Sequence, residues 1–318
     1  MAHELTATDH MVSGSNITPW HGLGTVLPGQ LTATEALQAA KLDWQVVQEP
    51  TFDADMTKHE GFQFNRRSDT REVLGVVEKG WEPVQNDRLL EIAEAIAQVD
   101  STDFRPVVET AGSLRGGRIV WAMVKIGQRT FADSPHASYL LLSNGHDGKR
   151  ALRGTLTDVR VVCANTLRCA ETTAASLYVS HAKGVDARIN TALKTLGWAN
   201  EATNATFAIY EALAKTKVSE FQAHEVFKKL VLGNAETATS GETQTIMRMT
   251  DLFRNGAGNE GKSAFDILNA VTDWADHCKG YREDKNTAER RFMGSTLGGE
   301  ADRLKTTAFK AVRSLVSV

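Results

Sequence analysis

Apolar and polar residues alternate with a period of two in the segments that follow Trp44, and short polar turns separate these segments. Such alternation is typical of antiparallel strands that turn one face towards a core. It predicts strands at Trp44–Val47, Gly61–Arg67, Val73–Val77 and Trp81–Val84. Asn86 is then a candidate N-cap, and apolar residues at helical spacing predict a helix over Asp87–Gln98 that buries one face of the sheet.

A second set of strands is predicted at Phe104–Thr110, Arg118–Ile126, Tyr139–Ser143 and Ala151–Thr157. In Arg118–Ile126 both alternating sets of side chains are largely apolar, which predicts a central strand covered on both faces. The polar, glycine-containing segment Asn144–Gly148 predicts a hairpin loop between the last two strands. The pattern becomes ambiguous at Val159–Thr173, which fits either a further strand or a helix.

Beyond Asp186 the apolar residues follow the helical period. Helices are predicted at Ala187–Leu196, Ala202–Thr216, Glu220–Leu232, Thr243–Arg254, Ser263–His277 and Leu304–Val316. Strands first and helices later indicate the α+β class, with an N-terminal antiparallel sheet and packed helices followed by a mainly helical C-terminal half.

Three regions are expected along the 318 residues. Residues 1–43 form an arm and a short helix at Ala33–Ala40, which begins at a capping box made by Thr32 and Glu35. Residues 44–185 form the β-rich core, and residues 186–318 form the helical region. This length is compatible with one large domain or two ordinary ones.

The formal net charge of −3 provides no overall attraction to nucleic acids or anionic membranes, so any anion-binding surface must be a local patch. No signal peptide and no apolar run of about 20 residues are recognisable, and three irregularly spaced cysteines do not suggest disulfides. We therefore expect a cytoplasmic protein that does not enter a membrane.

One part of the chain is locally cationic, because the segment from Arg115 to Arg168 contains nine basic residues and only three acidic ones. Basic side chains along strands, with aromatic rings for stacking, are what single-stranded nucleic acid requires. The residues expected to bind it are Arg66, Arg67, Trp81, Lys149, Arg150, Arg153, Arg160 and Arg168. The alternative is an ordinary solvated sheet face whose charges are compensated by acids such as Glu49.

Gly256–Ser263 matches the phosphate-loop pattern through Gly256, Gly261, Lys262 and Ser263. A phosphate loop follows a buried strand, whereas the residues before Gly256 are predicted to be helical. A nucleotide-binding enzyme and a simple helix-to-helix loop are the two interpretations.

Other polar residues that could carry chemistry are His146–Asp147, His181 and the group Asp273, Asp276, His277 and Cys278. Within this group Asp273 and His277 lie four residues apart on one helix face. No second ligand pair of recognisable spacing completes a metal site. No nucleophile elbow and no catalytic triad can be assembled either. We assign no catalytic residue, no metal and no cofactor.

Several stretches resemble a family of phage- and plasmid-encoded proteins of unknown function, the phage/plasmid-like proteins. These stretches are Trp20–Gly24, Val73–Val77, Trp81–Asn86, Leu142–Gly148, Arg160–Leu167 and Asn269–His277. The resemblance implies a mobile-element setting and supplies no catalytic residues. It also implies that the phosphate-loop match is accidental, since the family typically lacks a lysine at the position of Lys262.

A strand meander with a packed helix and basic strands is also similar in outline to phage single-strand annealing proteins. We therefore expect a homo-oligomer that binds single-stranded DNA and assists annealing or recombination. The alternatives are a nucleotide-binding enzyme that uses Lys262 and Ser263, and a non-enzymatic phage protein that binds a host factor through its helical half.

Overall fold

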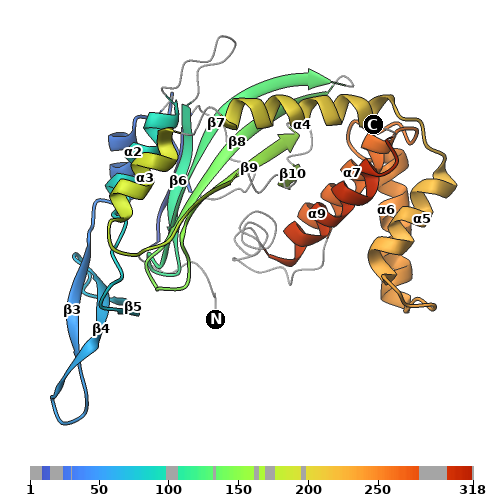
Figure 1. Cartoon of the computed structure of the whole chain (residues 1–318). Coiled ribbons are helices and arrows are strands. Elements are labelled where there is room, and N and C mark those ends of the chain that lie inside the picture. The colour runs from blue at the N-terminus through green and yellow to red at the C-terminus, as the bar shows by residue number, and fades with distance from the viewer. Residues whose placement is uncertain are drawn as a thin grey trace. The chain divides into compact units, whose positions relative to one another are not determined.

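The computed structural model describes residues 9–14, 24–29, 31–97, 107–131, 134–160, 165–168, 176–194, 198–278 and 299–316. The chain divides into two compact units. Unit 1 comprises Met1–Gly127, Tyr139–Leu156 and Thr172–Asn200, and unit 2 comprises Gln128–Ser138, Thr157–Glu171 and Glu201–Val318. Strands dominate the first half and helices the second, which confirms the predicted α+β class (Figure 1).

The large sheet has the strand order β10-β9-β8-β7-β6-β1-β2, and β11 pairs with β9. Its strands are β1 (Met11–Ser13), β2 (Thr25–Val26), β6 (Val107–Leu114), β7 (Ile119–Phe131), β8 (Ser134–Gly145), β9 (Leu152–Arg160), β10 (Asn165–Arg168) and β11 (Ser176–Val179). The four predicted strands of the second set correspond to β6–β9. The side chains of Ile119–Val124 are all fully buried, which confirms that β7 is covered on both faces.

Further short strands complete this sheet; β1, β2 and β11 were not predicted, whereas β10 is the strand alternative for Val159–Thr173. β10 occupies part of the ambiguous segment Val159–Thr173, of which residues 161–164 and 169–173 lie outside the described part. β1 lies against β6 because Gly112 leaves room for it: a Cβ atom there would approach the Met11 side chain to 2.6 Å. Asp9, just before β1, closes the β6–β7 turn by accepting from the amides of Gly116 and Gly117 at 2.7 and 3.0 Å.

Helices α1 (Ala33–Ala39), α2 (Asn86–Ala97) and α3 (Val185–Lys194) belong to unit 1. α1 and α2 pack against each other and against β6, and α3 packs against β11 (Figure 1). Leu89 and Ile92 of α2 are fully buried, as their helical spacing predicted. The predicted capping box is present, because the Thr32 hydroxyl accepts from the Glu35 amide at 3.2 Å and the Glu35 carboxylate accepts from the Thr32 amide at 2.9 Å.

A second, three-stranded antiparallel sheet in unit 1 has the order β3-β4-β5. Its strands are β3 (Val46–Phe52), β4 (Lys58–Arg67) and β5 (Val73–Glu78), as the alternation predicted, but β3 and β4 are longer than expected. β5 pairs only with Phe62–Arg66, so the β3–β4 hairpin continues beyond it as a two-stranded ribbon (Figure 1).

The predicted strand Trp81–Val84 is wrong. Only Trp81 makes an isolated β-bridge, with Ala182. Pro83 has no amide hydrogen for a ladder. The carbonyl groups of this segment accept from side chains instead: Gln48 donates to Trp81, His181 to Glu82 and Asn144 to Val84.

Unit 2 is built from the helices α4 (Trp198–Lys215), α5 (Glu220–Leu232), α6 (Ser240–Asn255), α7 (Ala264–Asp273) and α9 (Glu300–Arg313), with a π-helical turn η2 (Trp274–Cys278) after α7. These confirm the predicted helices. Aromatic residues fill its core, among them Tyr210 and Phe265, whose ring centroids lie 5.5 Å apart. One buried ion pair joins Lys305 of α9 to Asp276 of η2 at 2.9 Å. Among the described residues, no helix is both long and apolar enough to cross a bilayer.

Candidate functional site

Arg66 of β4, the first predicted nucleic-acid residue, is ion-paired. Its Nε lies 2.8 Å from a carboxylate oxygen of Glu49 on the neighbouring strand β3. Glu49 also pairs with Arg71, and Arg66 donates to the Arg71 carbonyl at 2.9 Å. The Arg66 guanidinium lies 5.3 Å from the ring centroid of Phe64, two residues away on the same face of β4. A phosphate would have to compete with Glu49 for it.

Arg67 points to the opposite face of β4 and is buried, with 2% of its surface exposed. It donates to both carboxylate oxygens of Asp69, at 2.9 and 2.7 Å, and lies 4.4 Å above the ring of Trp44. The hydrogen bonds from Arg67 lower the pKa of Asp69. Arg67 therefore has the contacts of a structural residue, and its guanidinium is not accessible to DNA.

Lys149 and Arg150 lie in the β8–β9 turn. Asp147 closes this turn by accepting from the Lys149 amide at 2.9 Å, and the Lys149 side chain is exposed. The turn packs on β5: a Cβ atom at Gly75 would lie 2.7 Å from the Asp147 backbone, so only glycine fits there. Arg150 is half-buried.

Arg153 is exposed on β9, directly opposite Tyr178 of the edge strand β11. Its guanidinium lies 5.4 Å from the centroid of the Tyr178 ring, and 62% of the Tyr178 surface is exposed. Within the described part of the chain, no carboxylate lies within ion-pair distance of Lys149 or Arg153. Exposed, unneutralised cations beside an exposed ring are suited to binding an anion that also carries aromatic groups.

Two further predicted residues, Arg160 and Arg168, belong to unit 2. Arg160 ends β9 opposite Asn165, and Arg168 ends β10 opposite Thr157. Their side chains lie outside the described part of the chain.

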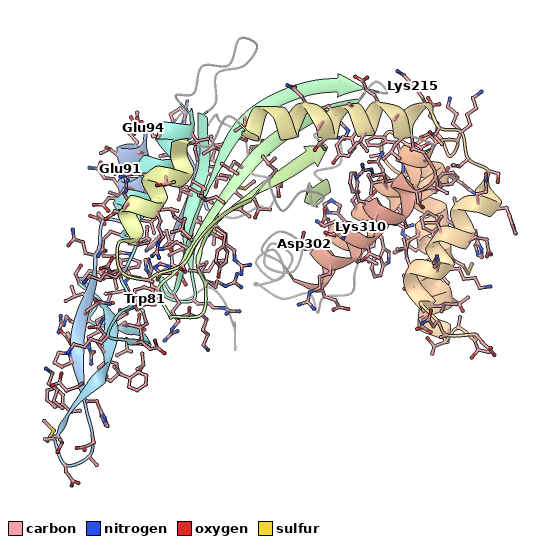
Figure 2. All side chains as sticks on the ribbon, in the orientation of Figure 1. Trp81, Glu91, Glu94, Lys215, Asp302 and Lys310 are labelled. Atoms are coloured by element: carbon pink, nitrogen blue, oxygen red, sulfur yellow. The ribbon has the colours of Figure 1, made fainter. Side chains whose placement is uncertain are left out.

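Trp81 stacks on His181, with ring centroids 4.2 Å apart and planes inclined by 16°. Figure 2 shows Trp81 where the three-stranded sheet meets the rest of unit 1. Trp81 is half-buried, so one face of the indole is already used by a neighbour within the protein.

The segment Trp81–Asn86 is held by a clamp of three side chains: His181, Asn144 and His146. The two histidines were named as candidates for chemistry, but the clamp itself was not predicted. His181 donates from Nδ1 to the Glu82 carbonyl at 2.9 Å, and Asn144 donates to the Val84 carbonyl at 2.9 Å. His146 contacts the Asn86 side-chain oxygen through Nε2 at 2.9 Å. The clamp therefore binds every second residue of the segment: Glu82, Val84 and Asn86. Its side chains are 60 to 99 residues away from these partners along the chain.

Hydrogen bonding defines the tautomer of each histidine in this clamp. Asn86 donates from its amide nitrogen to the carbonyls of Leu42 and Trp44, at 3.0 and 3.1 Å, which leaves its oxygen to accept from Nε2–H of His146. Burial lowers the pKa of His146 to about 3, helped by His181 and Arg67, and burial also lowers the pKa of His181. Both imidazoles are therefore neutral at physiological pH.

The signal for this clamp was present in the sequence, because Trp81–Asn86 and Leu142–Gly148 are two of the stretches that carry the family resemblance. Trp81–Val84 was predicted as a strand and Asn144–Gly148 as a hairpin loop, because the sequence does not show which of their polar groups are buried. The structure explains these stretches as fold determinants that join β8 to the start of α2.

The phosphate-loop match lies in a helix-to-helix loop between α6 and α7, as the helical pattern before Gly256 indicated. The amides of Lys262 and Ser263 donate to the carboxylate of Asp266, at 3.1 and 3.0 Å. Asp266 thus takes the amides that would receive a phosphate in a true phosphate loop. The Lys262 ammonium pairs with Glu260.

No group of three or more histidine, cysteine, aspartate or glutamate side chains forms a metal-ligand set among the described residues. Asp273 ends α7 and His277 lies in η2, so the two do not continue one regular α-helical face. Cys278 is a free thiol.

A domain of unknown function, DUF932, matches residues 73–295, which is more than half of the chain. No curated protein and no solved structure matches this chain. The matched region begins at β5 and includes the clamp, the β8–β9 turn and the exposed Arg153–Tyr178 pair. The chain therefore belongs to the DUF932 family, whose function is unknown.

Proposed function

We propose that this protein binds single-stranded DNA on the face of β9 and β11 that carries Arg153 and Tyr178, with Lys149 and Arg150 in the adjoining turn. The observation that carries the proposal is the Arg153–Tyr178 pair: an exposed ring next to a guanidinium with no carboxylate partner among the described residues. Phosphates attract the guanidinium, and the tyrosine ring offers a platform on which one base can stack.

Arg66 and Arg67 are not part of this proposed surface, because their charges are paired with Glu49 and Asp69. Trp81 is half-buried and stacks on His181, so one face of its indole is already occupied. The function in the cell that we propose is assistance of strand annealing or recombination by a homo-oligomer in a mobile-element setting. Annealing requires no covalent chemistry, only screened phosphates and accessible bases.

The experiment is fluorescence anisotropy of a labelled single-stranded oligonucleotide at several salt concentrations, with a duplex of equal length for comparison. We expect salt-sensitive binding that prefers the single strand. Replacing Lys149, Arg150 and Arg153 together by alanine should reduce the slope of log K against log salt by about 2, since each phosphate contact contributes about 0.7.

The matched control removes the same charge from basic residues of unit 1 that are ion-paired with Glu49 or Glu60: Lys58, Arg71 and Lys79. This triple alanine variant should bind with an unchanged slope. Equal effects of the two triple variants would reduce the proposal to a general charge effect. Absence of binding at low salt would remove it.

A further inference from the structure

The β3–β4 hairpin carries an exposed arm that the proposed DNA site does not use. Every residue from Phe52 to Phe62 is exposed, and β5 does not extend along this part of the hairpin. Figure 1 shows the arm projecting from the rest of unit 1 as a two-stranded ribbon. A ribbon of this kind buries little surface and is marginally stable by itself, so a partner surface would stabilise it.

The tip of the arm is a well-defined turn. Asp53 donates from its amide to the Thr57 carbonyl at 2.9 Å, and its carboxylate accepts from the amides of Asp55 and Thr57 at 2.9 and 2.8 Å. These bonds hold Met56 at a φ of 60°, a left-handed conformation that costs a non-glycine residue roughly 1 kcal/mol. The tip therefore presents one side chain in a fixed place.

That side chain is apolar and lies in water. Met56 is 75% exposed, more than any other large apolar side chain among the described residues. Asp55, which precedes Met56, carries an exposed carboxylate that has no ion-pair partner in the described part of the chain. The tip thus combines a flexible thioether with two carboxylates, Asp53 and Asp55.

The complementary chemistry lies on another surface of the same unit. Tyr178 offers an exposed aromatic ring, and Arg153 and Lys149 offer positive charges. Methionine sulfur packs favourably on aromatic rings, and an aspartate next to it would meet the guanidinium. The arm and this face of β9 and β11 match in both their apolar and their charged parts.

We propose that the arm of one molecule docks on the β9–β11 face of a second copy of this chain, with Met56 against Tyr178 and Asp55 beside Arg153. Because the two surfaces differ, the contact is head-to-tail, and further copies can add at either end. The same face would then receive either an arm or single-stranded DNA. Only this competition rests on the proposed function; the contact between copies does not.

Sedimentation velocity of the full chain over a range of concentrations tests the contact without DNA. The wild type should self-associate, and Met56→Gly should weaken association by about tenfold or more, because it removes the side chain at the centre of the contact. Glycine is favoured at this φ, so the melting temperature of the variant should stay equal or rise. Phe221→Ser, which removes another exposed side chain from α5 in unit 2, is the control and should associate as the wild type does.

Mixing two variants tests the head-to-tail geometry. Arg153→Glu keeps the arm and loses the receiving face, whereas Met56→Gly keeps the face and loses the tip. At a concentration where the wild type associates, each variant alone should be largely monomeric, and an equal mixture should form dimers that grow no further. A wild type that is monomeric at all concentrations, or a Met56→Gly variant that associates normally, would overturn the proposal.

Anisotropy distinguishes this failure from that of the proposed function. If DNA binds but the wild type does not self-associate, the arm contact is absent and the DNA site stands. If copies associate but no DNA binds, the arm contact stands and the DNA site is absent. If both occur, adding single-stranded DNA should lower the extent of association, and an unchanged extent would contradict the shared face.

Discussion

Two groups of basic residues in unit 1 look alike in the sequence but differ in the structure. Arg66 and Arg67 on β4 pair with Glu49 and Asp69. Lys149 in the β8–β9 turn and Arg153 on β9 are exposed, and no carboxylate lies within ion-pair distance of either among the described residues. Arg66 lies over the ring of Phe64 and Arg153 over the ring of Tyr178 at similar distances.

The difference shows that a basic strand indicates an anion-binding surface only after its ion pairs are known. On β4 the neighbouring strand and the following turn supply the acids, so the charges support the three-stranded sheet. On β9 the neighbouring residues are Tyr178 and Thr155, which leave the charge available. A count of basic residues therefore overstates the anion-binding surface on β4, where the charges are paired, and indicates it correctly on β9, where they are not.

The largest expected effect follows from removing the buried member of the paired group. Arg67→Ala should lower the free energy of unfolding by about 3 kcal/mol, because it empties a buried site against Trp44 and removes two hydrogen bonds to Asp69. Arg153→Ala should change it by less than about 0.5 kcal/mol. Urea denaturation measures both. Equal losses would erase the distinction between the groups.

Acid should weaken unit 1 through His146, the buried neighbour of the Arg67 charge. The folded-state pKa of about 3 lies below the unfolded value of about 6.5, so the stabilisation is complete above about pH 6.5 and is lost as the pH falls towards 3. This one group should reduce stability by about 2 kcal/mol between pH 7 and pH 5.

His146→Gln can still donate to Asn86 and does not titrate, so its stability should vary less with pH over this range. The control is His59→Gln on the exposed arm, which should keep the wild-type pH dependence. Denaturant titrations at each pH compare the three proteins. A His146→Gln profile parallel to that of the wild type would mean that another group is responsible.

The two arginine–aromatic pairs should differ in DNA binding. Tyr178→Ala should weaken binding of the single-stranded oligonucleotide by about 1 to 2 kcal/mol, because base stacking on an aromatic ring contributes about this much. Tyr178→Phe keeps the ring and should bind normally. Phe64→Ala removes the matched ring beneath Arg66 and should change the affinity by no more than about twofold, because Arg66 is already ion-paired with Glu49. Fluorescence anisotropy measures the affinity of each variant for the oligonucleotide. An equal loss of affinity in Phe64→Ala and Tyr178→Ala would contradict the difference between the two pairs.

The smallest effect concerns Lys262, another basic residue with an acidic partner. Lys262→Ala should alter stability by less than about 0.5 kcal/mol, because its ion pair with Glu260 is exposed. ATP with magnesium should not raise the melting temperature of either protein. Asp266→Ala should cost about 1 kcal/mol, since Asp266 completes the capping box of α7. A shift with ATP in the wild type that Lys262→Ala abolishes would restore the nucleotide hypothesis.

Prediction from the sequence succeeded where structure depends on residues close along the chain. The helices of unit 2 follow from apolar spacing, and the capping box of α1 follows from two residues three apart. It failed at Trp81–Val84, where apolar residues suggested a strand but side chains from elsewhere took the carbonyl groups. Asn144 is 60 residues from Val84 and His181 is 99 residues from Glu82, so no local pattern announces these bonds.

The candidate site was predicted only in part, for the same reason. Arg153 and Lys149 were identified as basic residues, but Tyr178 was missed because the register of β11 on β9 places it beside Arg153. The exclusion of Arg67 depends on burial, and that of Arg66 depends on Glu49, 17 residues away. Neither follows from composition.

The sequence by itself determined the α+β class, the positions of most strands and helices, and the presence of excess positive charge near β9. Only the tertiary structure decided which charges are neutralised, which histidines are buried and neutral, and which aromatic ring meets an exposed guanidinium. The physical reason is the distance along the chain over which each interaction acts. Hydrophobic periodicity and capping act over a few residues, whereas ion pairing, burial and hydrogen-bond satisfaction depend on whichever distant segment packs alongside.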